Sequence, residues 1–139
     1  MIAFDTDVLS HLLIGNPRFV ARAASIPHSE QCVPIVVVAE AMRGRLHSIR
    51  QAESDQGKLS IDMAYGLFMK TLEGVTRYTV LPYDTAAESC FQTWRTMKLK
   101  VGSQDLRIAA TCVAHDVTLV TRNARDFTLV PGLKLDIWN

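Results

Sequence analysis

Residues 1–14, MIAFDTDVLSHLLI, hold a short apolar run that ends in an acidic residue and is followed by apolar residues at helical spacing. The apolar run predicts a buried β-strand with Asp5 at its carboxyl end. The residues after it predict a helix, with Thr6 or Asp7 as its N-cap. This passage from strand to helix recurs along the chain, and it therefore decides the fold class.

The rest of the chain continues the alternation of apolar strands and amphipathic helices. Strands are predicted over residues 1–4, 31–36, 77–81, 117–120 and 133–138, the last as an edge strand. Helices are predicted over 8–14, 17–26, from 37, 61–75, from 84 or 85, and 106–113, while 48–58 fit a helix end, a loop or both. This order predicts an α/β fold, a three-layer α/β/α sandwich with a mostly parallel central sheet of four to five strands. No linker or repeat interrupts it, so residues 1–139 form one domain.

Composition excludes several classes of protein. Of 139 residues, 48% are apolar and 21% are charged, with a net charge of +1, which argues against disorder and against a strongly basic or acidic tail. No apolar stretch approaches the ~18 residues of a membrane span, and no basic segment opens a signal peptide. The three cysteines form no CxxC pair and the four histidines show no zinc-ligand spacing. We therefore expect a cytoplasmic protein with reduced thiols.

Five polar residues fall where an open α/β sheet binds its ligands, beyond the carboxyl ends of the strands. Asp5 follows the first strand, and Glu40 follows the second within an apolar stretch. Asp105 opens the helix before the fourth strand, and Asn123 and Asp126 follow that strand. We expect these side chains to converge.

A convergence of carboxylates needs a compensating charge, because desolvation and mutual repulsion both raise their pKa values. Mg²⁺ or Mn²⁺ suits such hard oxygen ligands and activates water against a phosphodiester, with Asp5 as the central ligand. Plainer interpretations stay open: Asp105 as an N-cap, Asp5 to Asp7 as a helix cap, and Asp126 as a solvated loop residue. Glu40 is the hardest to explain in that way.

Four short motifs resemble those of PIN-domain ribonucleases, and most of all the VapC-type toxins of toxin–antitoxin pairs. They are FDTDVL (4–9), VAE (38–40), QDLRIAA (104–110) and VTRNARDF (120–127), followed by a similar tail over 130–138. The resemblance covers the whole chain. It implies an endoribonuclease that depends on Mg²⁺ or Mn²⁺, acts on RNA, forms a homodimer and is blocked by a small cognate antitoxin.

The resemblance also implies roles for individual residues. Asp5, Glu40 and Asp105 match the three core acids, and the fourth position falls to Asn123 or Asp126. All of these are expected as metal ligands, and the four acids as catalytic residues. Asp7 departs from the family pattern, in which Asn is frequent, and we interpret it as a helix cap.

Cations near the acids are expected to contact RNA phosphates. The candidates, each of which also fits a solvated helix face, are Arg43, Arg45, Arg107, Arg122 and Arg125, with Lys98 and Lys100. Phe91 and Trp94 have the spacing of core residues rather than of a base-stacking platform, and the apolar helix 61–75 fits a partner face or core packing. Two rival functions remain open: an aspartate-based phosphatase with Asp5 as nucleophile, and a non-catalytic PIN-like module that binds RNA or protein.

Overall fold

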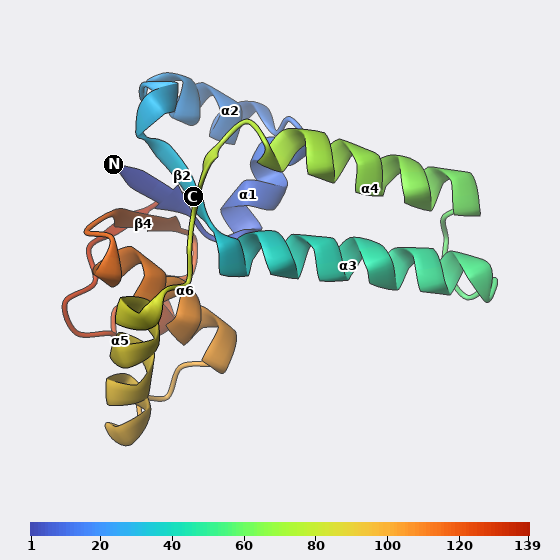
Figure 1. Cartoon of the computed structure of the whole chain (residues 1–139). Helices are drawn as coiled ribbons and strands as arrows, with labels where there is room; N and C mark the ends of the chain where they lie inside the picture. Colours follow the sequence, from blue (N-terminus) through green and yellow to red (C-terminus); the bar gives the residue numbers. More distant parts are fainter.

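The computed structural model describes residues 1–139 and contains a five-stranded sheet between layers of helices (Figure 1). In chain order the elements are β1 (Ile2–Phe4), α1 (Thr6–Leu13), α2 (Pro17–Ala24), the 3₁₀ turn η1 (His28–Glu30), β2 (Gln31–Pro34), α3 (Ile35–Glu53), α4 (Ile61–Val75), β3 (Thr79–Leu81), α5 (Thr85–Thr96), α6 (Ser103–Ala114), β4 (Thr118–Thr121), α7 (Ala124–Phe127) and β5 (Leu135–Ile137). The strand order is β3-β2-β1-β4-β5, and every pair is parallel. The predicted α/β/α sandwich is confirmed.

The helices are distributed over both faces of the sheet. In Figure 1, α1 and α2 lie on one face and α5 and α6 on the other, while α3 and α4 form a long antiparallel hairpin that projects from the sheet. The hairpin is anchored where α4 meets α1, because Gly74 lets the two helices approach closely: a Cβ there would lie 2.2 Å from Cδ2 of Leu13. No helix is both long enough and apolar enough to cross a membrane.

The second strand is shorter than predicted. The expected strand 31–36 ends at Pro34, and α3 begins at Ile35 with Pro34 as its N-cap. Residues 35–38, IVVV, are β-branched, and β-branched residues favour strands only weakly. Packing against α1, α4 and α6 overrides that preference, and α3 continues to Glu53 through part of the polar stretch that the sequence left open.

The core lies against both faces of the sheet. Phe4 of β1 is fully buried and packs edge-on against Trp138, with 5.6 Å between ring centroids. Trp138 follows the edge strand β5 and is nevertheless 1% exposed, because its backbone N–H donates to Thr121 and its ring also approaches Phe19. Phe91 and Trp94 of α5 are buried, as expected of core residues.

The topology brings one edge of the sheet together as a site. β2, β1 and β4 are neighbours, so their carboxyl ends meet at Pro34, Phe4 and Thr121. The chain leaves β1 toward β2 on one side, whereas β4 flanks β1 on the other, which makes this edge the switch point where open parallel sheets bind ligands. Because α6 runs back to feed β4, its first turn also lies at this edge.

Candidate active site

Asp5 occupies the centre of this edge and is held from two sides. Its Oδ1 accepts a hydrogen bond from the backbone N–H of Val8 at 2.8 Å, so Asp5 itself is the N-cap of α1. Its Oδ2 accepts a hydrogen bond from the hydroxyl of Thr121. The predicted caps of α1, Thr6 and Asp7, are therefore wrong, because the carboxylate directly after the strand already reaches the free N–H.

Asp5 is buried, and its environment disfavours the charged form. It is 6% exposed, and this burial raises the pKa of its carboxyl, with a further rise from the negative charges of Asp7 and Glu40. The hydrogen bonds from Thr121 and Val8 lower the pKa without cancelling the effect of burial. Two hydrogen bonds thus orient the carboxyl of Asp5, while its burial makes the negative charge costly.

Glu40 reaches the same edge from the second turn of α3. Its Oε2 accepts a hydrogen bond from the hydroxyl of Thr6 at 2.6 Å, which links α3 to the start of α1. Asp105 lies in the first turn of α6 but does not cap it, because the N-cap is Gly102. The N-cap interpretation of Asp105 is therefore wrong, although its place in the first turn of α6 still suits a negative charge.

The electrostatics of Asp105 indicate that the acids are neighbours. Burial raises the pKa of its carboxyl, and so do the nearby charges of Glu40, Asp126 and Asp5. The charges of three acids that are far apart in the sequence thus act on Asp105 at this edge of the sheet.

Asp126 and Asn123 belong to α7, the short helix after β4. Asn123 caps this helix through its Oδ1, and its Nδ2 donates to Oδ2 of Asp126 at 3.2 Å. The amide of Asn123 is therefore occupied in orienting Asp126. Asp126 is half-buried rather than a free loop residue, with only the exposed Arg125 as a distant ion-pair partner at 4.0 Å.

Two threonines that the sequence did not single out organise the site. Thr121 is fully buried, donates to Asp5 and accepts from the backbone N–H of Asn123 at 2.9 Å. Thr6 holds Glu40 in the same manner. In the sequence, only their positions could have indicated this role. Thr121 is the last residue of β4, and Thr6 directly follows Asp5.

The donor set fits a hard divalent cation in its chemistry. All four acids offer carboxylate oxygens, which Mg²⁺ and Mn²⁺ prefer, and a cation would relieve their repulsion. However, no three carboxylate, imidazole or thiol groups are arranged to hold one ion as the side chains stand. Both oxygens of Asp5 and one of Glu40 accept a single internal hydrogen bond each, which orients these carboxylates and leaves a lone pair on every oxygen for a cation.

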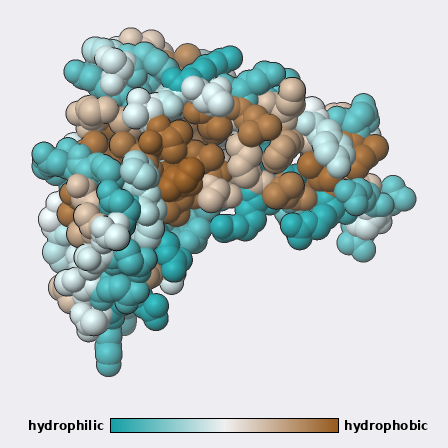
Figure 2. All heavy atoms as spheres, viewed as in Figure 1, coloured by the Kyte–Doolittle hydropathy of each residue, from teal (hydrophilic) through white to brown (hydrophobic).

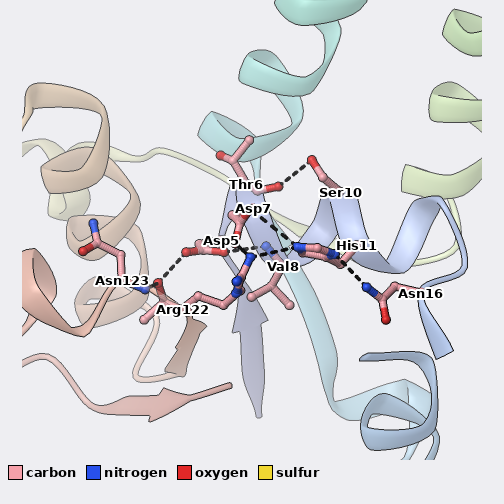
Figure 3. Close-up of polar contacts among 10 residues, drawn as sticks. Asp5, Thr6, Asp7, Val8, Ser10, His11, Asn16, Arg122 and Asn123 are labelled. Atoms are coloured by element: carbon pink, nitrogen blue, oxygen red, sulfur yellow. Dashed lines mark hydrogen bonds and ion pairs between the residues drawn. The ribbon is translucent and has the colours of Figure 1, made fainter. Parts of the chain in front are cut away.

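A second polar cluster lies beside the first, on the exposed side of α1. Nη1 of Arg122 lies 3.2 Å from Oδ2 of Asp7 and 3.0 Å from Nε2 of His11 (Figure 3). The ring of His11 also stacks on that of Phe19. Asp7 is therefore an ion-pair partner rather than the helix cap that the sequence suggested. Arg122, expected to contact RNA, is held by this cluster.

The other predicted RNA-contacting arginines are dispersed. Arg107 packs over the ring of Phe91 at 4.6 Å and bonds Gln104 at 3.1 Å. Arg43 and Arg125 are exposed, and Arg45 is half-buried between α3 and α4. The structure thus gives these arginines different surroundings, and their contact with RNA stays a prediction.

The sequence matches a known family model and two curated proteins. The family model of the PIN domain matches residues 2–133. Ribonuclease VapC2 of Rickettsia felis is 30% identical over 108 residues, which cover 75% of this chain and 71% of the relative. The tRNA(fMet)-specific endonuclease VapC of Salmonella typhimurium is 24% identical over 139 residues, covering 96% and 95% of the two chains.

The fold is also found among solved structures. VapBC2 of Rickettsia felis, in a crystal structure with a DNA fragment from its promoter, contains a chain that superposes with a TM-score of 0.79. The match covers 100% of both chains at 20% identity.

Proposed function

The chain belongs to the PIN-domain family and to its VapC-type ribonucleases, and on that basis we propose that it hydrolyses RNA with the help of a divalent cation. The proposed metal ligands and catalytic residues are Asp5, Glu40, Asp105 and Asp126, with Asn123 holding Asp126. The observation that carries the proposal is the grouping of acids around Asp5 and Asp105, whose pKa values are raised first by burial and then by the charges of neighbouring acids. A structural role alone does not explain why four like charges gather there.

When bound, Mg²⁺ or Mn²⁺ supplies the positive charge that lowers the pKa of a coordinated water and offsets charge on the phosphate. The protein's part is to place the carboxylates. Thr121 and the N–H of Val8 fix the rotamer of Asp5, and Thr6 turns Glu40 toward α1. Asn123 orients Asp126 from the turn after β4.

Asp5→Asn tests the proposal with little disturbance of the fold, because Asn is also a good N-cap and its Oδ1 can still accept from Val8. We expect wild type to cleave RNA in Mn²⁺ and to stop in EDTA, and Asp5→Asn to be inactive. Total tRNA is the first substrate to test, since the Salmonella relative is named for a tRNA. Equal cleavage by wild type and variant would show that the metal-site assignment is wrong.

Metal binding provides an independent readout of the same site. A ligand that binds only the folded state raises its stability by about 2.7 kcal/mol at 100 times its Kd. Saturating Mn²⁺ should therefore raise the Tm of wild type clearly and that of Asp5→Asn much less. An equal rise in both proteins would place the ion elsewhere.

A second candidate function is a non-catalytic module that binds RNA or protein. It is favoured by one observation, that no three potential ligands are arranged for one ion. Binding of RNA without cleavage in either Mg²⁺ or Mn²⁺ would support it. Membership of the family leaves little support for an aspartate-based phosphatase.

We also propose a cognate antitoxin and a homodimer as partners. The antitoxin is supported by the VapBC assemblies among the structural neighbours. Exposed apolar side chains offer contact area: Met63, Tyr65 and Met69 of α4 are more than half exposed, and Figure 2 shows apolar residues along the hairpin. Light scattering on the purified chain, alone and with its antitoxin, measures both states. The cytoplasmic location stays a prediction.

A further inference from the structure

A cavity of about 270 Å³ opens next to Glu40, between α1 and the α3–α4 hairpin. Thr6 and Ser10 line it from α1, Glu40, Gly44 and Arg45 from α3, and Thr71 from α4. Its size is close to the lower end of the range of about 300–1,000 Å³ for ligand sites, which suits one nucleotide unit. The larger cavity of about 700 Å³ lies at the opposite edge of the sheet, near the starts of β2 and β3, and contains none of the four acids.

Arg45 enters this cavity in a fixed position. Its Nε donates to Oγ1 of Thr71 at 3.0 Å, and the Thr71 hydroxyl, 3% exposed as a residue, donates to the carbonyl of Leu67 at 3.0 Å. These two hydrogen bonds hold the guanidinium through its Nε atom only. Neither Nη atom of Arg45 has a hydrogen-bond or ion-pair partner in the protein. The exposed Arg43 and Arg50 are also unpaired, but Arg45 is half-buried and lines a cavity.

A half-buried guanidinium with a free fork of N–H groups is a binding site for a planar or tetrahedral oxyanion. Glu40 lines the same cavity, but its Oε2 is taken by Thr6. The cavity contains no aromatic ring on which a base could stack. Its chemistry therefore suits a phosphate of the nucleic-acid backbone rather than a base.

The position of Arg45 continues the site away from the acids. A second cavity of about 260 Å³ shares Leu13, Arg45 and Thr71 with the first and adds Lys70 of α4. Arg45 therefore lines both cavities. The first also contains Glu40, and the second also contains Lys70. The two cavities together thus present one acid, Glu40, and two positive charges, Arg45 and Lys70.

We propose that the cavity between α1 and α3 is a backbone-phosphate subsite for the RNA strand, in which Arg45 binds the phosphate next to the scissile one. The assignment rests on the proposed nuclease function and extends it to substrate placement. Thr71 acts as a positioning residue that aims the guanidinium. Since the subsite contacts phosphate alone, it contributes equally to RNAs of every sequence.

The chain offers a matched pair of variants that leaves Arg45 untouched. Gly44 lines the cavity and Gly66 of α4 does not, and a Cβ at either position meets nothing within 4 Å. Both are helical, so Gly44→Leu and Gly66→Leu should each gain helix propensity. Only Gly44→Leu places a side chain in the cavity that is proposed to hold the RNA strand.

The experiment measures binding of a labelled single-stranded RNA by fluorescence anisotropy, in EDTA to prevent cleavage, across a series of KCl concentrations. We expect Arg45→Ala to weaken binding about tenfold and to reduce the salt slope by about one ion. Arg45→Lys should keep the slope with an intermediate affinity. Gly44→Leu should bind as weakly as Arg45→Ala, and Gly66→Leu as well as wild type. Thermal unfolding checks each fold, and Gly44→Leu carries the test alone if Arg45→Ala unfolds.

The results separate this proposal from the proposed function. If wild type cleaves tRNA in Mn²⁺ but Arg45→Ala and Gly44→Leu bind RNA with the affinity and slope of Gly66→Leu, the subsite is wrong and the nuclease stands. That outcome also covers a cavity that serves a protein partner instead of RNA. If wild type never cleaves but both variants lose RNA binding, the subsite stands as part of a binding module.

Discussion

Two polar clusters flank the start of α1 and differ in almost every physical respect. Asp5 is the buried member of a cluster of like charges that is otherwise half-buried, and hydroxyl and backbone donors rather than a cation hold its carboxyl. Two residues later, Asp7 belongs to an exposed cluster of opposite charges with Arg122 and His11. The first is unfavourable for the folded chain without a counterion, whereas the second is an ordinary surface arrangement. Two acids that are close in the sequence can therefore lie in very different environments.

The largest contrast should come from isosteric changes in the two clusters. Glu40→Gln keeps the acceptor for Thr6 but removes one charge of the cluster around Asp5, so RNA cleavage in Mn²⁺ should fall roughly 100-fold or more. Asp7→Asn should keep cleavage within about twofold, because its ion pair is exposed and weak. Initial rates on tRNA measure both. Equal losses would mean that Asp7 belongs to the site.

The hydroxyl at the end of β4 supports Asp5, so its removal should affect both stability and the pKa of Asp5. Thr121→Val leaves an oxygen of Asp5 and the N–H of Asn123 without their partner, at a cost of about 1–3 kcal/mol in the free energy of unfolding. Loss of this hydrogen bond should also raise the pKa of Asp5 further. Urea denaturation and the pH profile of cleavage measure the two effects. A variant as stable as wild type would show that the hydroxyl is not structural.

The pH dependence of stability should differ in sign from that of a favourable ion pair. Burial and the charges of Glu40, Asp126 and Asp5 raise the folded pKa of Asp105 above its unfolded value. The metal-free protein should therefore lose stability as pH rises from the unfolded pKa through the folded pKa, and regain it on acidification. Asp105→Asn should be more stable than wild type at neutral pH, and the difference should vanish at low pH. Urea titrations in EDTA follow it.

The smallest effect should come from the exposed cluster. Arg122→Ala removes a surface ion pair, so the free energy of unfolding should fall by less than about 1 kcal/mol, and salt should reduce the loss. Asp7→Asn supplies the matched change from the other side of the pair. A loss that is larger and independent of salt would show that the cluster is more than a surface contact.

Some residues of the site could be predicted from the sequence, and others could not. Asp5 and Glu40 could be singled out because each lies beside apolar residues where a carboxylate is costly, and parallel strands meet at one edge. Thr6 and Thr121 could not, because a threonine is common in either setting and only its partner gives it a role. The cap of α1 was assigned to the wrong residue for a similar reason, since Asp5, Thr6 and Asp7 all have capping side chains and local sequence does not rank them.

The fold was predictable where periodicity is strong and less so at boundaries. A mostly parallel sheet of four to five strands was predictable from the alternation of short apolar runs and amphipathic helices, whereas the strand order comes only from the structure. The end of β2 did not, because residues 35–38 are β-branched and become helical only through packing. In the same way, the sequence left the polar stretch after residue 47 open, and α3 continues through it to Glu53.

The amino-acid sequence alone determines the α/β class and the placing of acids after strands, because hydrophobic periodicity and the order of residues along the chain are local properties. Only the tertiary structure decides which acids face one another, which hydroxyls hold them and which arginine is left with free donors. Those properties depend on burial and on distances between segments more than 100 residues apart, as between Thr121 and Asp5. Desolvation, which raises the pKa of a carboxyl, exists only once these segments have come together.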